Sequence, residues 1–390
     1  MHSSRHKIKN DTILFSPLTL AGVTLKNRIV ISPMCTYSCA GDGLATDWHL
    51  VHLGKFALGG ATVVCVEATA VEARGRITYG DLGIWSKAHA SALKPIAAFI
   101  KAHGALPAIQ IAHAGRKASM QRPWESNAPI YPEDHLPGEP PWPTVAASAV
   151  PVRDGWPVPQ ELSLSEIRSL QQSFVSAAQY ALEAGFEILE IHSAHGYLAH
   201  SFLSPLSNKR TDGYGGSLGG RMRFTLETVE QVRKAWPASN PLFVRISSID
   251  VDGSPEGWQL SDSAALALEL KVRGVNVVDC SSGGIAGLAT AAIGAQPLGF
   301  RIPYADHIRR ASGMVTMTVG LILRPDQAEA ALQAGNTDLI GIGREALYDP
   351  FWALHAAYQL GVDPEFRDWP EPYGWWLVRR EALLKQIGEA

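Results

Sequence analysis

Cysteine and unbalanced charge are both scarce in this sequence, and each shortage excludes a class of protein. Only four cysteines stand among 390 residues, at Cys35, Cys39, Cys65 and Cys280. They form no CxxC pair and no Cys/His set with zinc spacing, so we expect free thiols, no metal site and no iron–sulfur centre. The formal net charge is −3 and no basic stripe occurs, which argues against a nucleic-acid partner.

Long apolar runs are missing as well. No segment approaches the ~20 apolar residues that a membrane-spanning helix needs, and residues 1–11 lack the apolar stretch of a signal peptide. Hydrophobic residues still make up 46% of the chain, which is enough for a large core. We therefore expect a globular, cytoplasmic protein that does not contact a membrane.

The chain does contain many short β-branched runs separated by stretches with helical spacing. Several runs are continuously apolar, which is typical of parallel strands buried on both faces. The eight expected strands are 28–34, 61–71, 106–113, 186–192, 241–247, 275–281, 314–320 and 337–344. The expected helices are 86–103, 165–184, 217–235, 261–273, 304–311 and 325–334. Eight such units favour an α/β fold, a closed (β/α)8 TIM barrel.

Two stretches depart from this rhythm. Residues 121–160 follow the third expected strand and hold ten of the 25 prolines, so we predict a long irregular excursion that shapes the substrate mouth or an interface. The aromatic stretch 370–376 predicts a C-terminal tail that docks over a pocket or against another subunit. The predicted organisation is one barrel domain over 12–377, a polar N-terminal arm over 1–11 and a tail over 378–390.

The most informative residues follow the fourth expected strand. Chemistry in this fold gathers at the carboxyl ends of the strands, and there the sequence places His192, His195 and Tyr197 within six residues. The two histidines could be zinc ligands or a structural pair, but no third ligand with matching spacing follows. Three hydrogen-bond donors together favour a site that stabilises an anion.

Glycines at the ends of the last three expected strands form a second group. Gly283, Gly320 and Gly343 would let backbone N–H groups approach an anion, and Arg344 would add a charged donor. This combination favours a phosphate-bearing ligand over simple turn glycines.

Other polar residues stand near the expected mouth. Gln110 can donate and accept at once, which suits the edge of a heterocycle, and Arg245 could stabilise negative charge on such a ring. Arg245 could instead pair with a barrel carboxylate such as Glu67 or Glu190. The simplest interpretation of Cys35, at the end of the first strand, is a small buried hydrophobe.

Several long segments, in one order, resemble the Old Yellow Enzyme family of FMN-dependent ene-reductases. Within it they are most similar to the branch that includes the xenobiotic reductases and the thermophilic-like enzymes. The resemblance runs from about Leu14 to Trp376. Its segments read NRIVISPMC at 27–35, VEATAV at 66–71, QIAHAGRK at 110–117, EIHSAHGY at 190–197, FLSPLSNKRTD at 202–212 and IGR at 342–344.

The resemblance implies FMN bound across the barrel mouth. The ring and ribityl chain would contact Pro33, Met34, Cys35, Ala68, Gln110 and Arg245. Gly320, Gly343 and Arg344 would hold the phosphate. The Cys35 thiol would tune the flavin without acting as a covalent nucleophile.

The same resemblance implies how the substrate is handled. His192 and His195 would hold the carbonyl or nitro oxygen of an electrophilic alkene, and Tyr197 would donate the proton. Tyr37 and Trp376 would line the substrate pocket, with Trp376 acting in its own chain or in a neighbour's. The implied activity is reduction of activated C=C bonds by an NADPH dehydrogenase, with NADPH or NADH as hydride donor. A homodimer or higher homo-oligomer is expected.

Three alternatives remain at this point. A flavin-free TIM-barrel lyase or aldolase could act on a phosphorylated substrate, although no expected strand end carries the lysine that Schiff-base chemistry needs. A non-catalytic scaffold would not explain the donors gathered at one face. A dienoyl-CoA reductase type of flavoenzyme would need an iron–sulfur cysteine cluster and a further nucleotide-binding domain.

Overall fold

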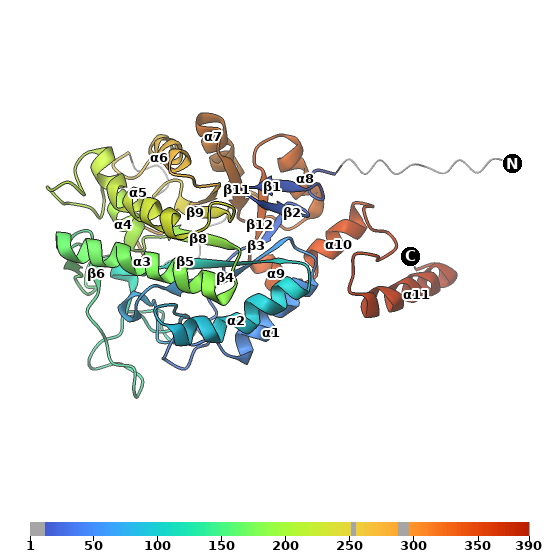
Figure 1. Cartoon of the computed structure of the whole chain (residues 1–390), viewed down its shortest axis with the longest axis horizontal. Helices are drawn as coiled ribbons and strands as arrows, with labels where there is room; N and C mark the ends of the chain where they lie inside the picture. The colour runs from blue at the N-terminus through green and yellow to red at the C-terminus, as the bar shows by residue number, and fades with distance from the viewer. Residues whose placement is uncertain (1–11, 251–254, 288–295, 390) are drawn as a thin grey trace.

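The expected apolar runs form one closed parallel barrel (Figure 1). The computed structural model describes residues 12–250, 255–287 and 296–389, so the expected arm at 1–11 lies outside the described residues. Around the barrel the strands are β3 Ile29–Ile31, β4 Val63–Ala70, β5 Leu106–Ala112, β8 Ile188–Ser193, β9 Leu242–Ser247, β10 Val277–Ser281, β11 Val315–Val319 and β12 Leu339–Ile342. Strand β12 pairs with β3 and closes the barrel. The eight predicted strands and the TIM-barrel fold are confirmed.

Burial on both faces explains why the strands lack alternation. Every residue of β4 and β8 is buried. Side chains such as Val63, Phe243 and Met317 form a cluster inside the barrel, and a larger cluster lies between the strands and the helices. An antiparallel hairpin, β1 Leu18–Leu20 and β2 Val23–Leu25, adds to the inner cluster. It closes the end where the strands begin, so the opposite end is left for a site.

The helices surround the barrel as an outer layer (Figure 1). Their bounds are α1 Asp47–Leu58, α2 Lys87–Ala102, α3 Leu164–Ala184, α4 Leu198–Leu203, α5 Leu218–Ala235, α6 Leu260–Val272, α7 Ile302–Ser312, α8 Pro325–Gln333, α9 Arg344–Tyr348, α10 Trp352–Gln359 and α11 Glu371–Ile387. Ser163 begins α3 with a capping box, in which Ser163 and Glu166 satisfy each other's backbone N–H groups. The predicted helices appear, with ends shifted by one or two residues.

The structure contains a helix that the sequence pattern did not predict. Helix α1 lies between β3 and β4, and His49 and His52 are among its buried residues. Polar residues therefore interrupt the apolar stripe that identifies an amphipathic helix. Helix α1 completes the expected βα unit between β3 and β4, although two of its buried side chains are imidazoles.

The excursion over 121–160 is irregular, as predicted. Its regular structure consists of a two-residue strand, β6 Val145–Ala146, which pairs with β7 Gln160–Glu161. Short 3-10 turns at Ala73–Gly75 and Gly115–Lys117 lie at the same end of the barrel, after β4 and β5. The loops that follow the strands thus build a deep mouth.

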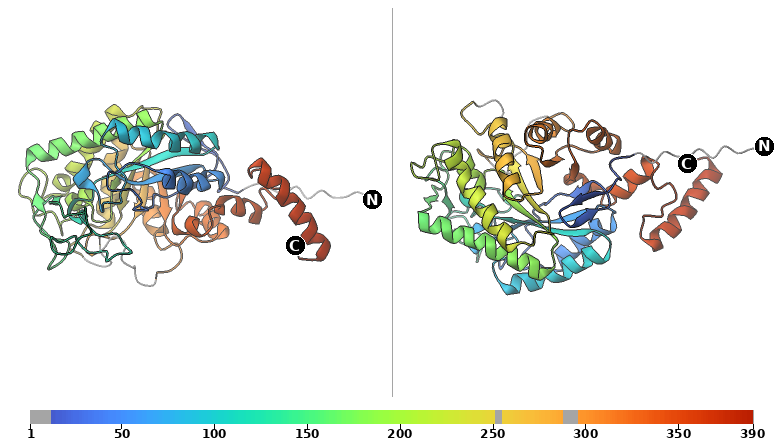
Figure 2. Two further views of the ribbon diagram at one scale, coloured as in Figure 1. Left: turned by 90° about the horizontal axis from the view of Figure 1, so that it is seen from below. Right: turned by 45° about the horizontal axis from the view of Figure 1, so that its top comes forward.

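The C-terminal segment differs from the predicted tail. Helix α11 runs through residue 377, so the predicted boundary there falls inside a helix. Figures 1 and 2 show α11 standing away from the barrel, beyond α10. Proline at position 372 did not prevent this helix because a first-turn proline lacks only an N–H that has no partner there. Among the described residues, no helix is both long and apolar enough to cross a bilayer.

Candidate active site

A polar cavity opens where β3, β11 and β12 end. It has a volume of about 420 Å³, and six predicted cofactor residues line it: Pro33, Met34, Arg245, Gly320, Gly343 and Arg344. Arg301, at the start of α7, lines it too and donates from Nε to Ser282 Oγ at 2.9 Å. Closure of the barrel brings these residues together, because β12 pairs with β3.

This cavity fits an anionic, phosphate-bearing group. Three arginine side chains meet in it, and the Ser32 Oγ atom is buried there without a hydrogen-bond partner among the described residues. Burial and the positive charge of Arg245 lower the pKa of Arg301 to about 10. Cations held this close repel each other, so a bound phosphate would relieve both the repulsion and the missing hydrogen bond.

Beneath the mouth, neighbouring strands place charged residues in one layer. The register pairs His192 of β8 with Arg245 of β9, and Arg245 with Asp279 of β10. Arg245 Nε lies 3.2 Å from Asp279 Oδ2. Arg245 therefore pairs with a barrel carboxylate, as the alternative interpretation expected, but the residue is Asp279 rather than Glu67 or Glu190.

Gln110 is held by the barrel interior. Its Nε2 donates to Glu190 Oε1 at 2.7 Å, and both residues are buried on paired strands. Burial, and then the charge of Asp279, raises the pKa of Glu190. Gln110 is not among the residues that line the polar cavity, so its contact with a cofactor stays a prediction.

The two predicted histidines hydrogen bond to each other. His192 Nδ1 accepts from the Ala194 N–H at 3.1 Å, so a neutral His192 carries its proton on Nε2. His192 Nε2 lies 3.2 Å from His195 Nδ1, and His195 Nε2 lies 2.7 Å from Ser281 Oγ. Among the described residues, no group of three side chains is placed to hold a metal ion. The His192 N–H thus faces His195, and the His195 N–H faces Ser281.

The donors are neutral at physiological pH. Burial, and then the charge of Arg245, lowers the pKa of His192 and of His195 well below the usual range. Burial, and then Cys35, raises the pKa of Tyr197 well above its usual value. Each ring thus keeps a proton that it can share with an acceptor.

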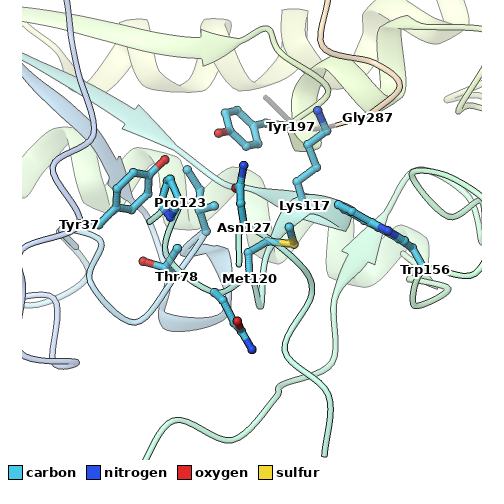
Figure 3. A pocket seen from close by; sticks show the side chains of 11 residues that line it. Tyr37, Thr78, Lys117, Met120, Pro123, Asn127, Trp156, Tyr197 and Gly287 are labelled. Carbon is cyan, nitrogen blue, oxygen red and sulfur yellow. The ribbon is translucent and has the colours of Figure 1, made fainter. Parts of the chain in front are cut away.

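Tyr197 lies beside His192 and lines a small pocket. The Tyr197 and His192 rings are perpendicular, with centroids 5.0 Å apart. Figure 3 shows Tyr37, Tyr197 and Lys117 around this pocket, together with Thr78, Met120 and Asn127. Trp156 of the excursion also lines it, so the prediction that residues 121–160 shape the mouth is confirmed.

The remaining predicted residues lie in several places. Ala68 and Tyr197 line a small neighbouring pocket. Burial raises the pKa of Cys35 well above its usual value, which keeps the thiol protonated and opposes a nucleophilic role. The Gly283 N–H donates to Ile249 O, and Gly283 O accepts from Ser247. Gly283 is thus engaged within the protein and is absent from the lining of the polar cavity.

Trp376 does not lie in the pocket of its own chain. It stands on α11 with 66% of its surface exposed and packs perpendicular to Trp375. An assignment within one chain is wrong because α11 leaves the barrel, whereas a role in a neighbouring subunit stays a prediction.

Lys117 is the residue that strand-end reasoning missed. It lies in the 3-10 turn after β5, is buried, and lines the pocket beside Tyr197. Burial, and then Arg116, lowers the pKa of Lys117 to about 7. No expected strand end carries a lysine, but Lys117 reaches the mouth from the turn beyond β5. The Lys117 amine is nevertheless engaged, since Nζ donates to His195 O at 2.9 Å and to Gly284 O.

Comparison with known proteins identifies the family of the chain. A model of the NADH:flavin oxidoreductase / NADH oxidase family matches residues 13–363. An NADPH dehydrogenase of Geobacillus sp. (strain WCH70) is 44% identical over 353 residues, covering 90% of this chain and 96% of the relative. One from Geobacillus thermodenitrificans (strain NG80-2) is 43% identical over 356 residues, covering 91% and 96%.

Solved structures have the same fold. An old yellow enzyme homologue from Zymomonas mobilis superposes with a TM-score of 0.71 at 26% identity, covering 89% of this chain and 92% of that one. Morphinone reductase superposes with a TM-score of 0.74 at 24% identity, covering 90% of each chain.

The barrel and its mouth define a TIM-barrel enzyme with neutral donors beside an anion-binding cavity. The chain belongs to the NADH:flavin oxidoreductase / NADH oxidase family, the Old Yellow Enzyme family. It is an oxidoreductase of the NADPH dehydrogenase type, which uses FMN with NADPH or NADH. The flavin-free lyase or aldolase and the non-catalytic scaffold are thereby excluded.

Glu67 makes the stability of this mouth depend on pH. Its Oε2 accepts from the Thr36 N–H at 2.9 Å and from the Thr36 O–H at 2.7 Å. Burial raises the pKa of Glu67 to about 8 from its usual value of 4.5. Between these values the folded state binds more protons than the unfolded state, so this group's contribution falls as pH rises.

We expect Glu67→Gln to become more stable than the wild type as pH rises from about 5 to about 8, by on the order of a few kcal/mol. Below about pH 4.5 both side chains are neutral in the folded and the unfolded state, so the two stabilities should match there. Urea unfolding at each pH measures the difference. The matched control is Glu183→Gln on the exposed face of α3. A Glu67→Gln difference independent of pH would contradict this account.

Proposed function

We propose that this enzyme reduces activated C=C bonds, such as those of α,β-unsaturated carbonyls and nitroalkenes. One observation carries the proposal: His192 Nε2 and His195 Nδ1 lie 3.2 Å apart, and the Tyr197 ring centroid is 5.0 Å from that of His192. Two donors that converge this closely can share one oxygen atom, and a proton donor stands beside them. Enones, maleimides, nitroalkenes, nitroaromatics and nitrate esters all carry an oxygen of this kind.

The histidines stabilise negative charge that develops on the substrate oxygen. When bound, FMN supplies the hydride that it takes from NADPH or NADH. Addition of a hydride at Cβ moves charge onto the activating oxygen, where two imidazole N–H groups act as an oxyanion hole does. Both rings are neutral and held in place, so the change that they need is confined to the position of the His195 proton.

Ser281 allows both rings to donate at once. To donate from Nδ1, His195 must move its proton from Nε2, and Nε2 must then accept a hydrogen bond. The Ser281 hydroxyl lies 2.7 Å away and can either accept or donate. Substrate binding is therefore coupled to a change of the Ser281 hydroxyl from hydrogen-bond acceptor to hydrogen-bond donor.

Tyr197 supplies the second half of the reduction. The substrate carbanion at Cα is a far stronger base than a phenolate, so a buried Tyr197 hydroxyl, though weakly acidic, can protonate it. Burial keeps the hydroxyl protonated until that step. Tyr37 lines the opposite part of the pocket and restricts how the substrate lies.

The polar cavity is the proposed FMN site. Arg344 and Arg301, with the backbone at Gly320 and Gly343, would hold the phosphate. Pro33, Met34, Cys35 and Ala68 would contact the ribityl chain or the ring. Gln110 and Arg245 would meet its polar edge, because Glu190 and Asp279 hold them from below.

We propose that the enzyme is a homodimer or larger homo-oligomer in which α11 contacts a neighbour. Large apolar side chains on α11 are exposed: Tyr373, Trp375, Trp376, Val378, Leu383 and Ile387. A 17-residue helix in water has marginal stability without packing. Trp376 would then line the partner's pocket. The free state of Cys35, Cys39, Cys65 and Cys280 supports a reducing, cytoplasmic location.

Arg344→Ala should weaken FMN binding by about 10- to 100-fold, the value of a charge-assisted hydrogen bond. Quenching of flavin fluorescence on titration of the FMN-free protein measures the dissociation constant. Arg324→Ala, at an exposed arginine, is the control and should leave it unchanged. Wild-type protein that is colourless and takes up no FMN would refute the site.

Tyr197→Phe should slow the oxidation of the reduced enzyme by an enone about 100-fold, because the proton donor is lost. Flavin reduction by NADPH should be spared, and stopped-flow absorbance separates the two steps. Tyr180→Phe, on the outer helix α3, is the control. Equal losses in both steps would count against a proton-donor role.

Mixed oligomers test Trp376. Each variant alone, Trp376→Ala or Tyr197→Phe, should reduce enones poorly. If Trp376 serves a neighbour's pocket, a Trp376→Ala chain paired with a Tyr197→Phe chain contains one site with both native residues. Mixing should then restore up to about half the wild-type rate per dimer. Trp48→Ala, an exposed tryptophan on α1, is the control. No restoration in verified mixed dimers would contradict the arrangement.

A further inference from the structure

The loop that carries the donors has an unusual backbone. His195 and Gly196 are consecutive left-handed residues, with φ of 60° and 75°. A non-glycine residue in this conformation costs about 1 kcal/mol or more, so surrounding contacts must maintain it. The Gly196 Cα lies so close to Gly284 O that a Cβ there would collide with it. The turn therefore has little freedom to shift.

Both ends of one peptide group in this loop are held by buried side chains. The carbonyl of His195 accepts from Lys117 Nζ at 2.9 Å. The N–H of Gly196, on the other side of the same peptide bond, donates to His200 Nδ1 at 2.8 Å. Because the peptide group is planar, fixing its oxygen and its hydrogen fixes the plane. That plane joins His195 to the residue before Tyr197.

The imidazole of His200 is itself held in one tautomer. Since Nδ1 accepts from Gly196, a neutral His200 carries its proton on Nε2, which donates to Asp250 Oδ1 at 2.7 Å. Asp250 also accepts from the Ser204 hydroxyl and, at 2.7 Å, from the backbone N–H of Trp258. These side chains are buried, so water cannot replace a lost hydrogen bond.

The holding groups come from different parts of the barrel. Lys117 follows β5, His200 lies in α4 after β8, and Asp250 follows β9. Lys117 also donates to Gly284 O, in the loop after β10. Four loops are thus tied to the turn that carries His195 and Tyr197.

We propose that Lys117 and the His200–Asp250 pair are positioning residues that clamp the His195–Gly196 peptide group and so hold His195 and Tyr197 in register. The proposal rests on the proposed function for the roles of those two residues. A rotated peptide would move the His195 donor and the Tyr197 hydroxyl together. Displacement of a catalytic group by about 1 Å can cost about 100-fold in rate.

His200→Leu removes the acceptor for Gly196, and His200→Asn restores one, because an Asn side-chain oxygen can reach the place of an imidazole Nδ1. Lys117→Met removes the donor to the carbonyl and keeps the apolar stem. Gln171→Leu is the matched control. Gln171 is equally buried and donates to Glu227 at 3.0 Å, between the outer helices α3 and α5.

The direct measurement does not depend on catalysis. Amide hydrogen exchange of Gly196 in the FMN-bound protein should be about tenfold faster in His200→Leu than in the wild type or the control. In ¹⁵N-histidine spectra, wild-type His200 should be protonated at Nε2 and unprotonated at Nδ1. The opposite tautomer, or unchanged exchange in His200→Leu, would overturn the proposal.

The functional measurement separates positioning from loss of stability. In His200→Leu and Lys117→Met, the dissociation constant of a phenol, which mimics the oxyanion, should rise about tenfold while that of FMN stays within about twofold. His200→Asn should recover most of this loss. The control should lower the melting temperature without changing phenol affinity. Phenol affinity that follows melting temperature across all variants would overturn the proposal.

Failure of the proposed function would look different. Wild-type enzyme that binds no phenol and reduces no activated alkene would refute the assigned roles of His195 and Tyr197. The exchange rate of Gly196 and the tautomer of His200 would still decide whether the clamp exists.

Discussion

Removal of the proposed catalytic side chains from water is the constraint on which the rest of the mouth depends. Desolvation holds His192 and His195 in the neutral form and keeps Tyr197 protonated. A charged imidazole or a phenolate would lose hydration that the protein does not replace. The same desolvation strengthens each hydrogen bond to a developing oxyanion, because no solvent screens it. Neutral donors and strong charge stabilisation thus have one physical origin.

Barrel closure brings buried polar side chains to their hydrogen-bond and ion-pair partners. Three adjacent strands carry His192, Arg245 and Asp279 in one layer, and the loop after β8 reaches Ser281 at the end of β10. These contacts join residues on or just after different strands, which no local sequence pattern records. The hydroxyl of Ser281 is well suited to this position, since it serves either tautomer of His195 without leaving a buried atom unpaired.

These contacts explain how far the sequence could be interpreted. Strands were predictable because burial on both faces leaves continuous apolar runs, and His192, His195 and Tyr197 were predictable because they follow such a run directly. Lys117 was missed because it lies five residues beyond the end of β5 and returns through a 3-10 turn. Asp279 was missed because it sits within a strand rather than at its end. The course of α11 could not be predicted, since its exposed apolar residues look like core residues in sequence.

Burial of ionisable groups in the mouth therefore lowers the stability of the folded protein and at the same time creates the environment that the proposed chemistry needs. Glu67, Glu190 and Lys117 are ionisable groups buried with few opposite charges. Burial raises the pKa of the two carboxyl groups and lowers that of the Lys117 amine, which favours the neutral form of each group. Protein stability must come from elsewhere, and the outer cluster of apolar residues between strands and helices is its main source. Because that cluster surrounds the strands and leaves their carboxyl ends free, substitutions in the mouth can alter chemistry while the barrel stays folded.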